Sequence, residues 1–253
     1  MKKVSLYGMI FCVLIFSACQ KELTGDVNTT RQYTVRITFQ PAVNNQALTI
    51  GETCQNDFRE DYTVTAFRFY TAYPSLKNNN ATLNITNEKK YRLVDAGISS
   101  SLSFTITTTD SVFNTLSFQV GVDSIDNVSG AQSGDIDPGK GMFWTWNSGY
   151  VMAKLEGTSS FSGMPANEFT YHVGGFSGEN NSIRTIALSA QQVKLNASHA
   201  TDIIVYADIN KWFNGAHALK ISDNAFVHSP GALAKQYADN YATMFSIAEI
   251  VSE

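Results

Sequence analysis

Apolar and polar residues alternate along most of the chain after residue 33. In segment 33–39, Val35, Ile37 and Phe39 fall on one side, and segment 62–70 alternates in the same way. Such alternation is typical of a β-strand with one buried face, because successive side chains point to opposite faces of a sheet. Runs rich in Val, Ile, Thr, Tyr and Phe predict further strands at 82–86, 90–95, 102–108, 114–123, 142–157, 168–175, 183–189 and 202–209. The pattern predicts an all-β fold, an antiparallel β-sandwich of about ten strands.

The segment 229–245 has helical spacing instead. Its apolar residues recur three or four positions apart, at Leu233, Tyr237, Ala238, Tyr241 and Phe245. Ser229 is a predicted N-cap, with Pro230 in the first turn. One short C-terminal helix is therefore expected to pack on the sandwich.

The N-terminus has the pattern of an export signal. Lys2 and Lys3 precede an apolar stretch at 4–16 that is short for a membrane span, and small residues lead to Cys19. This ending resembles the bacterial lipobox, in which the cysteine is lipidated. The alternative is an ordinary signal peptide followed by an incidental cysteine.

The predicted boundaries are a lipoprotein signal peptide at 1–18, a lipidated flexible tether at 19–32, and one β-sandwich domain at 33–253. Acyl chains on Cys19 would anchor the protein to a membrane of the cell envelope. We therefore expect it in the periplasm or at the outer-membrane surface.

Charge and motifs exclude several classes of function. The chain has 18 Lys and Arg against 22 Asp and Glu, a net charge of −4, so it lacks the basic character of a nucleic-acid-binding protein. The sequence contains no G-x-S-x-G, HExxH, CxxC or phosphate-loop motif. A hydrolase that uses Cys54 beside a histidine is the remaining enzymatic alternative. We expect a protein that is not an enzyme.

An acidic segment at 121–138 is a candidate calcium site. Its oxygen-bearing side chains are Asp123, Asp126, Asn127, Asp135 and Asp137. Calcium takes six to eight oxygen ligands of this kind, although the spacing is not that of an EF-hand. The alternative is a solvated turn in which Asp and Asn side chains bond to the backbone.

Tryptophan and histidine supply the other candidate chemistry. Trp144 and Trp146 lie two residues apart, which predicts that they share one strand face, either as core packing or beside a metal. The histidines are His172, His199, His217 and His228. None forms an HxH or HxxxH pair, so a copper or zinc site would have to be assembled by folding.

Three segments, 62–76, 121–157 and 169–175, are similar to the MbnP-like proteins, and the resemblance extends over about 33–246. The run from GDIDP through MFWTWNSGY to KLEG is its specific part. The resemblance implies an exported β-sandwich that binds one copper ion beside a histidine pair and an oxidised tryptophan. It also implies a partner, a di-haem enzyme of the cytochrome c peroxidase type, that oxidises the tryptophan.

The resemblance assigns roles to particular residues. His172 matches the histidine of the F-x-Y-H-x-G-G motif, and His228 is a second candidate copper ligand. Either Trp144 or Trp146 would be the oxidised tryptophan. The stretch from Asp123 to Asp137 is where calcium would bind.

One departure from the family pattern concerns the first strand. Copper-binding members tend to have a histidine there, whereas this chain has Gln40, and glutamine is a poor copper ligand. This predicts a weakened or absent copper site. The alternative function is a surface-exposed binding module for glycan or protein, which an exposed aromatic platform of Trp212 and Phe213 would favour.

Overall fold

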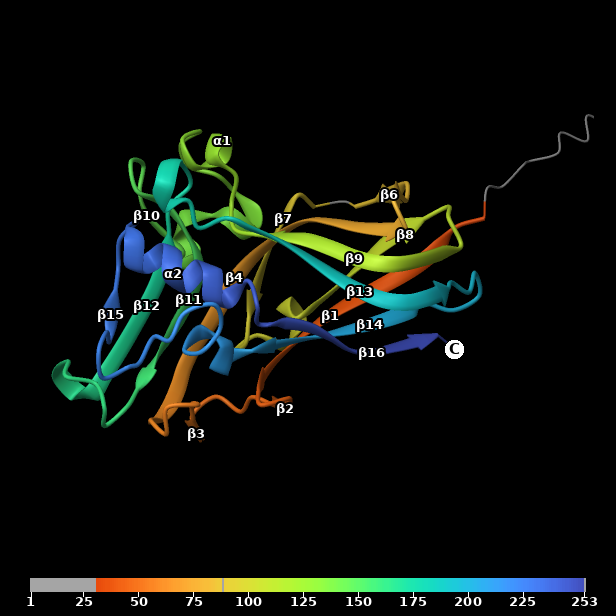
Figure 1. The fold of residues 1–253 in the computed structure, drawn as a ribbon. Helices are drawn as coiled ribbons and strands as arrows, with labels where there is room; N and C mark the ends of the chain where they lie inside the picture. The colour runs from red at the N-terminus through yellow and green to blue at the C-terminus, as the bar shows by residue number, and fades with distance from the viewer. Residues whose placement is uncertain (1–30, 88, 253) are drawn as a thin grey trace, which may run out of the picture. The chain divides into compact units, whose positions relative to one another are not determined.

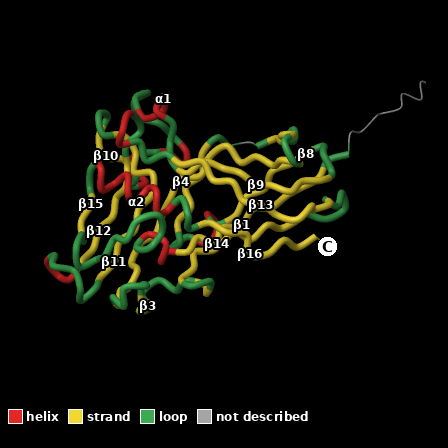
Figure 2. Tube along the Cα trace, viewed as in Figure 1, coloured by secondary structure: helices red, strands yellow, loops and turns green. Residues whose placement is uncertain are grey.

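Two β-sheets build the fold in the computed structural model, which describes residues 31–87 and 89–252 (Figures 1 and 2). Cys19, the predicted signal peptide and all of the predicted tether except Arg31 and Gln32 lie outside these residues. Within the described ranges, no helix has the length and apolar character needed to cross a membrane.

The six-stranded sheet has the order β16-β14-β1-β8-β6, with β2 paired to β1. Its strands are β1 (Tyr33–Val43), β2 (Gln46–Ala47), β6 (Ile85–Thr86), β8 (Ser103–Thr108), β14 (Thr201–Asp208) and β16 (Phe245–Ser252). Strands β1 and β14 run parallel, unlike the other pairs in this sheet. The long connection between these strands, which includes most of the other sheet, makes a parallel return feasible.

The ten-stranded sheet has the order β13-β9-β4-β11-β12-β15, and four short strands pair along β4 and β11. The main strands are β4 (Asp61–Asn78), β9 (Val112–Val120), β11 (Gly149–Thr158), β12 (Glu168–Gly174), β13 (Arg184–Lys194) and β15 (Phe226–Val227). The short ones are β3 (Thr53–Gln55), β5 (Ala81–Thr82), β7 (Tyr91–Asp95) and β10 (Phe143–Thr145). Strand β15 pairs with β12 in parallel.

The prediction of an all-β sandwich is confirmed. Ten of the sixteen strands in the described ranges have five or more residues, and the other six have two or three residues. The predicted strand at 142–157 is instead a hairpin of β10 and β11. The short helices are α1 (Ser124–Asn127), η1 (Ser99–Ser101), η2 (Gly134–Ile136), η3 (Pro138–Lys140), η4 (Pro165–Asn167), η5 (Gly178–Asn180) and η6 (Ile209–Trp212).

The core lies between the inner faces of the two sheets. Val35, Ile37 and Phe39 are buried together, as their alternation predicts. The ring of Phe39 meets Phe69 and Phe118 of the other sheet edge-on, each at a centroid distance of 5.2 Å. Burying each such side chain contributes about 1.5–3 kcal/mol, so this interface is a main source of stability.

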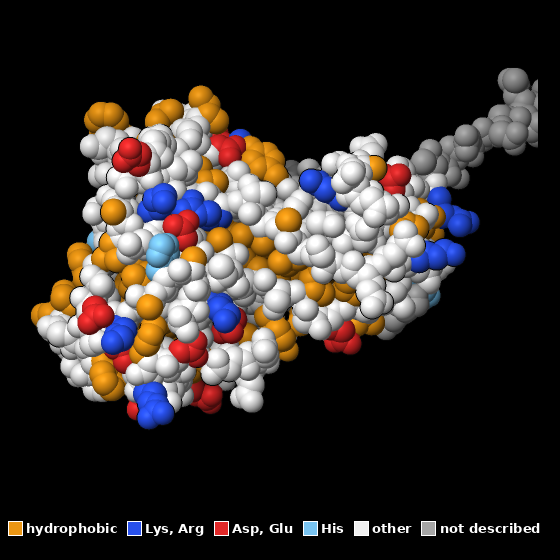
Figure 3. Space-filling view, in the orientation of Figure 1, with side chains coloured by type: hydrophobic (Ala, Val, Ile, Leu, Met, Phe, Trp, Pro, Cys, Tyr) orange, Lys and Arg blue, Asp and Glu red, His pale blue; other side chains and the backbone are white. Residues whose placement is uncertain are grey.

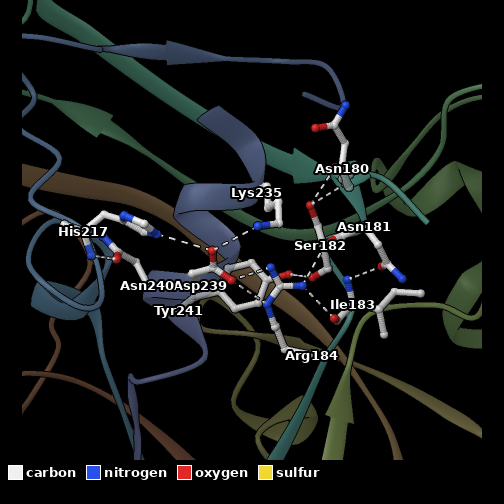
Figure 4. Close-up of polar contacts among 11 residues, drawn as sticks. Asn180, Asn181, Ser182, Ile183, Arg184, His217, Lys235, Asp239, Asn240 and Tyr241 are labelled. Atoms are coloured by element: carbon white, nitrogen blue, oxygen red, sulfur yellow. Dashed lines mark hydrogen bonds and ion pairs between the residues drawn. The ribbon is translucent and has the colours of Figure 1, made fainter. Parts of the chain in front are cut away.

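The predicted helix is α2 (Ala232–Tyr241), which packs against β12 (Figure 1). It begins after Gly231, so Ser229 is not its N-cap. Tyr237 stacks on Tyr171 of β12 at 4.5 Å. On the polar side of α2, Asp239 accepts hydrogen bonds from Nε and Nη2 of Arg184 on β13, as Figure 4 shows. These contacts fix the helix to the ten-stranded sheet.

Candidate metal centre

The parallel pairing of β12 and β15 brings two distant histidines together. Thr170 pairs with Phe226 and Tyr171 with Val227, so His172 and His228 occupy the next register position. Nδ1 of His172 lies 3.2 Å from Nε2 of His228, and the ring centroids are 4.3 Å apart. The structure therefore brings together the two histidines that the sequence analysis proposed as ligands.

Lys154 and Glu156 on β11 lie on the same sheet face as His172. Their neighbours Ala153 and Leu155 belong to the core, so alternation directs Lys154 and Glu156 to the outer face. Oε1 of Glu156 lies 2.5 Å from Nε2 of His172 and 3.6 Å from Nζ of Lys154. Lys154, which is buried, also donates a hydrogen bond to the carbonyl oxygen of Gly141 at 2.9 Å.

These contacts control the charge of the site. The hydrogen bond from His172 lowers the pKa of Glu156 to about 2 against the effect of burial, and the charge of Lys154 contributes in the same direction. Burial lowers the pKa of His228, and the nearby His172 and Lys154 lower it further. Glu156 is thus ionised and His228 is neutral near pH 7, as a metal-binding imidazole must be.

Sequence reasoning missed Lys154 and Glu156. Their alternation with Ala153 and Leu155 within a predicted strand was the available signal, because it placed two charged residues on one face. Their proximity to His172 depends on the register of β11 with β12, in which Lys154 is opposite His172.

The structure distinguishes the two tryptophans. Trp144 lies in β10, and its ring centroid is 5.8 Å from that of His228. Its Nε1 is buried and has no hydrogen-bond partner among the described residues. Trp146 lies in the turn after β10 and is 78% exposed. The prediction that both share a strand face is wrong, because the hairpin turn begins between them.

Trp146 is one of several large apolar side chains that are exposed among the described residues. Ile125 of α1 and the following Val128 are also exposed, at 65% and 60%. Figure 3 shows apolar side chains at the end of the ten-stranded sheet where α1 and β10 lie in Figure 1.

The other two histidines and Gln40 lie away from this pair. His199 is exposed in the turn before β14. His217 lies 3.3 Å from Asp239 of α2 (Figure 4). Gln40 lies in β1 opposite Tyr206, in the six-stranded sheet rather than in the sheet of the histidine pair.

The five predicted calcium ligands do not converge on one point. Nζ of Lys90 lies 2.6 Å from Asp126 and 3.2 Å from Asp123, between the rings of Tyr73 and Tyr91. A lysine ammonium therefore occupies the place between these carboxylates where a cation would bind. Although burial acts in the opposite direction, hydrogen bonds from Tyr73, Gln119, Lys90 and Tyr91 lower the pKa of Asp123.

The other three side chains have partners of their own. Asp135 lies 3.5 Å from Lys89 and 3.6 Å from Lys140. Asp137 accepts a hydrogen bond from the backbone of Gly139, and Asn127 bonds to backbone groups of Val122 and Tyr150. The calcium prediction thus lacks support, because lysines and backbone groups satisfy these oxygens.

The structure also bears on two of the alternatives. Trp212 and Phe213 are fully buried, and Trp212 donates a hydrogen bond to Sδ of Met244, so they form no exposed platform. Burial and the charge of Glu52 raise the pKa of Cys54. An activated cysteine nucleophile requires a lowered pKa.

The donor set of the histidine pair fits a metal ion in part. Imidazole nitrogens bind zinc at about 2.0–2.1 Å, so two of them on one ion lie within about 4.2 Å of each other. The 3.2 Å separation of Nδ1 in His172 and Nε2 in His228 meets this condition. No group of three or more His, Cys, Asp or Glu side chains is arranged to hold a metal ion in the described ranges.

Comparison with known proteins places the chain in a family. The MbnP family model matches residues 32–230, a range that includes both histidines and Trp144. The solved structure of MbnP from Methylosinus trichosporium is similar with a TM-score of 0.56, at 15% identity, over 80% of this chain and 83% of that chain. At 15% identity, this structural similarity shows that the two proteins share a fold. No curated protein matches. Because the family model covers most of the chain, this protein belongs to the MbnP family.

Proposed function

We propose that this protein binds copper through Nδ1 of His172 and Nε2 of His228. The observation that carries the proposal is the 3.2 Å approach of these two nitrogens on the outer face of the ten-stranded sheet. Imidazole is a common copper ligand, and membership of the MbnP family supports a copper-related role. Copper, when bound, would supply a one-electron redox couple.

The residues around the pair support binding rather than catalysis. The carboxylate of Glu156 offsets the charge of Lys154, which would otherwise oppose the binding of a cation. The ring of Trp144 lies beside that of His228, with the centroids 5.8 Å apart, and His228 itself is exposed, so a metal ion can reach it from solvent. With two protein ligands and no first-strand histidine, we expect weaker binding than in a site with three.

Titration of the metal-free protein with Cu(I) against a chromophoric competitor tests the proposal. We expect one equivalent to bind, and we expect His172→Ala and His228→Ala to abolish this binding. His199→Ala, which removes an exposed histidine outside the pair, is the matched control. Unchanged binding in the two pair variants would exclude the site.

We propose further that Trp144 is the tryptophan oxidised by a di-haem partner enzyme of the peroxidase type. Its position beside His228 and its unpartnered buried Nε1 support this choice. Opening the indole ring adds two oxygen atoms, with two equivalents of peroxide reduced to water. Peptide mass spectrometry on protein from the native host should locate the change at Trp144, with Trp146 unmodified. An unmodified Trp144 would contradict the proposal.

We propose that the protein is anchored in the cell envelope by lipid on Cys19. The support is the sequence of the N-terminal segment. Labelling with a fatty-acid analogue in the native host should mark the wild-type chain and leave Cys19→Ala unmarked. Incorporation that persists in the variant would contradict lipidation at this residue.

The alternative is a surface binding module without copper. The 78% exposure of Trp146 is the observation that favours it. In that case a glycan array should show binding that is lost in Trp146→Ala, while the copper titration shows no uptake.

A further inference from the structure

We propose that Glu156 is a positioning residue that fixes the tautomer of His172 and so presents Nδ1 to a metal ion. In its metal-related part, this inference rests on the proposed copper function. The tautomer itself is a property of the metal-free protein and is testable without copper.

The hydrogen bond from His172 to Glu156 determines where the proton lies. A carboxylate can only accept hydrogen bonds, so Nε2 of His172, at 2.5 Å from Oε1, must carry the hydrogen. In a neutral imidazole the other nitrogen then has the lone pair. That nitrogen is Nδ1, which faces Nε2 of His228 at 3.2 Å.

Lys154 holds Glu156 in this position. Its Nζ lies 3.6 Å from the same Oε1 that contacts His172 and is tied to the carbonyl oxygen of Gly141 at 2.9 Å. Because Lys154 lies directly opposite His172 in the register of β11 and β12, all three side chains come from paired strands. Such rigid support is what an outer carboxylate needs to orient a metal-binding histidine.

The arrangement also explains the charge balance at the site. Lys154 is buried beside the two imidazoles, and a cation at that point repels a second one. The carboxylate of Glu156 neutralises Lys154 while it orients His172. Glu156 therefore has two separable effects, one on geometry and one on charge.

Two substitutions separate these effects in the full chain. Glu156→Gln keeps an oxygen that accepts from Nε2 but removes the charge, whereas Glu156→Leu removes both. Glu168→Leu on β12, where the side chain is exposed, is the matched control. Glu156→Leu leaves the buried Lys154 without its carboxylate, which destabilises the fold. The double variant Glu156→Leu with Lys154→Met removes both charges and avoids this loss. Thermal unfolding measures the stability of each variant.

The first measurement is the tautomer of His172 in metal-free protein, by NMR with ¹⁵N-labelled histidine. The chain has four histidines, so the signals are assignable from single substitutions. We expect hydrogen on Nε2 in the wild type, Glu156→Gln and Glu168→Leu. A mixture of tautomers is expected in Glu156→Leu and in the double variant. Hydrogen on Nδ1 in the wild type, or an unchanged tautomer in both Leu variants, would overturn the inference.

The second measurement is the Cu(I) dissociation constant by chelator competition. We expect it to rise about 10–100-fold in Glu156→Leu, by less in Glu156→Gln, and not at all in Glu168→Leu. An equal value in all variants would overturn the metal-related part. If His172→Ala itself leaves copper binding unchanged, the proposed function fails, and the tautomer measurement alone decides the positioning role of Glu156.

Discussion

His172 and His228 face each other through Nδ1 and Nε2 at 3.2 Å, although 56 residues separate them in the chain. The parallel pairing of a seven-residue strand with a two-residue strand produces this contact. The chain thus builds a pair of nitrogen ligands at the edge of a sheet without a local histidine motif.

Stability should depend on pH through Glu156. Its pKa falls from the ordinary 4.5 to about 2 in the folded protein, so its contribution is complete above about pH 4.5 and is lost as pH falls toward 2. After allowance for partial exposure, we expect this contribution to be about 1–2 kcal/mol. Urea unfolding of the wild type and Glu156→Gln should differ at pH 6 and converge near pH 2. A constant difference over that range would contradict the assignment.

The close packing of Trp144 on β12 makes Gly174 sensitive to substitution. A Cβ at this position would lie 2.5 Å from Cζ3 of Trp144 and 2.7 Å from the carbonyl oxygen of Tyr150. Gly174→Ala should therefore reduce the free energy of unfolding by about 1–3 kcal/mol. Gly163→Ala, where a Cβ meets nothing within 4 Å, is the control in the same denaturation experiment. Equal effects of the two substitutions would contradict the packing of Trp144.

We expect the acidic segment to be stabilised by Lys90 rather than by a metal ion. Lys90→Met leaves Asp123 and Asp126 without their shared ammonium, and we expect a loss of about 1 kcal/mol in thermal unfolding. Lys194→Met, at an exposed position of β13, serves as the comparison. Addition of calcium or of a chelator should leave the melting temperature of the wild type unchanged. Stabilisation by calcium would show that the segment binds it.

Helix α2 should depend on its ion pair with β13. Asp239→Asn removes the charge that Arg184 contacts through Nε and Nη2 and that His217 and Lys235 also approach. Because these charges are partly exposed, we expect a destabilisation of about 1 kcal/mol that shrinks in high salt. Asp223→Asn, which lies outside this cluster, should have no comparable effect in salt-dependent urea unfolding.

Much of the fold was predictable because alternation is a local property. The buried face of β1 follows directly from Val35, Ile37 and Phe39, and the periodicity at 229–245 locates α2 within a few residues. The hairpin turn at Trp146 was missed, since a continuous aromatic run conceals the polar residues that form it. The parallel direction of β14 was also missed, because pairing partners are not encoded by alternation.

The sequence by itself determined most of the long strands, the C-terminal helix and the family, because apolar periodicity and the run at 134–157 are readable along the chain. It also named the histidines that a copper site would use. Only the tertiary structure decided which residues surround them. Strand register placed His228 and Glu156 on opposite sides of His172, brought Trp144 rather than Trp146 to the pair, and put Lys90 between the carboxylates proposed for calcium. These contacts depend on long-range hydrogen-bonded pairing, which no short segment specifies.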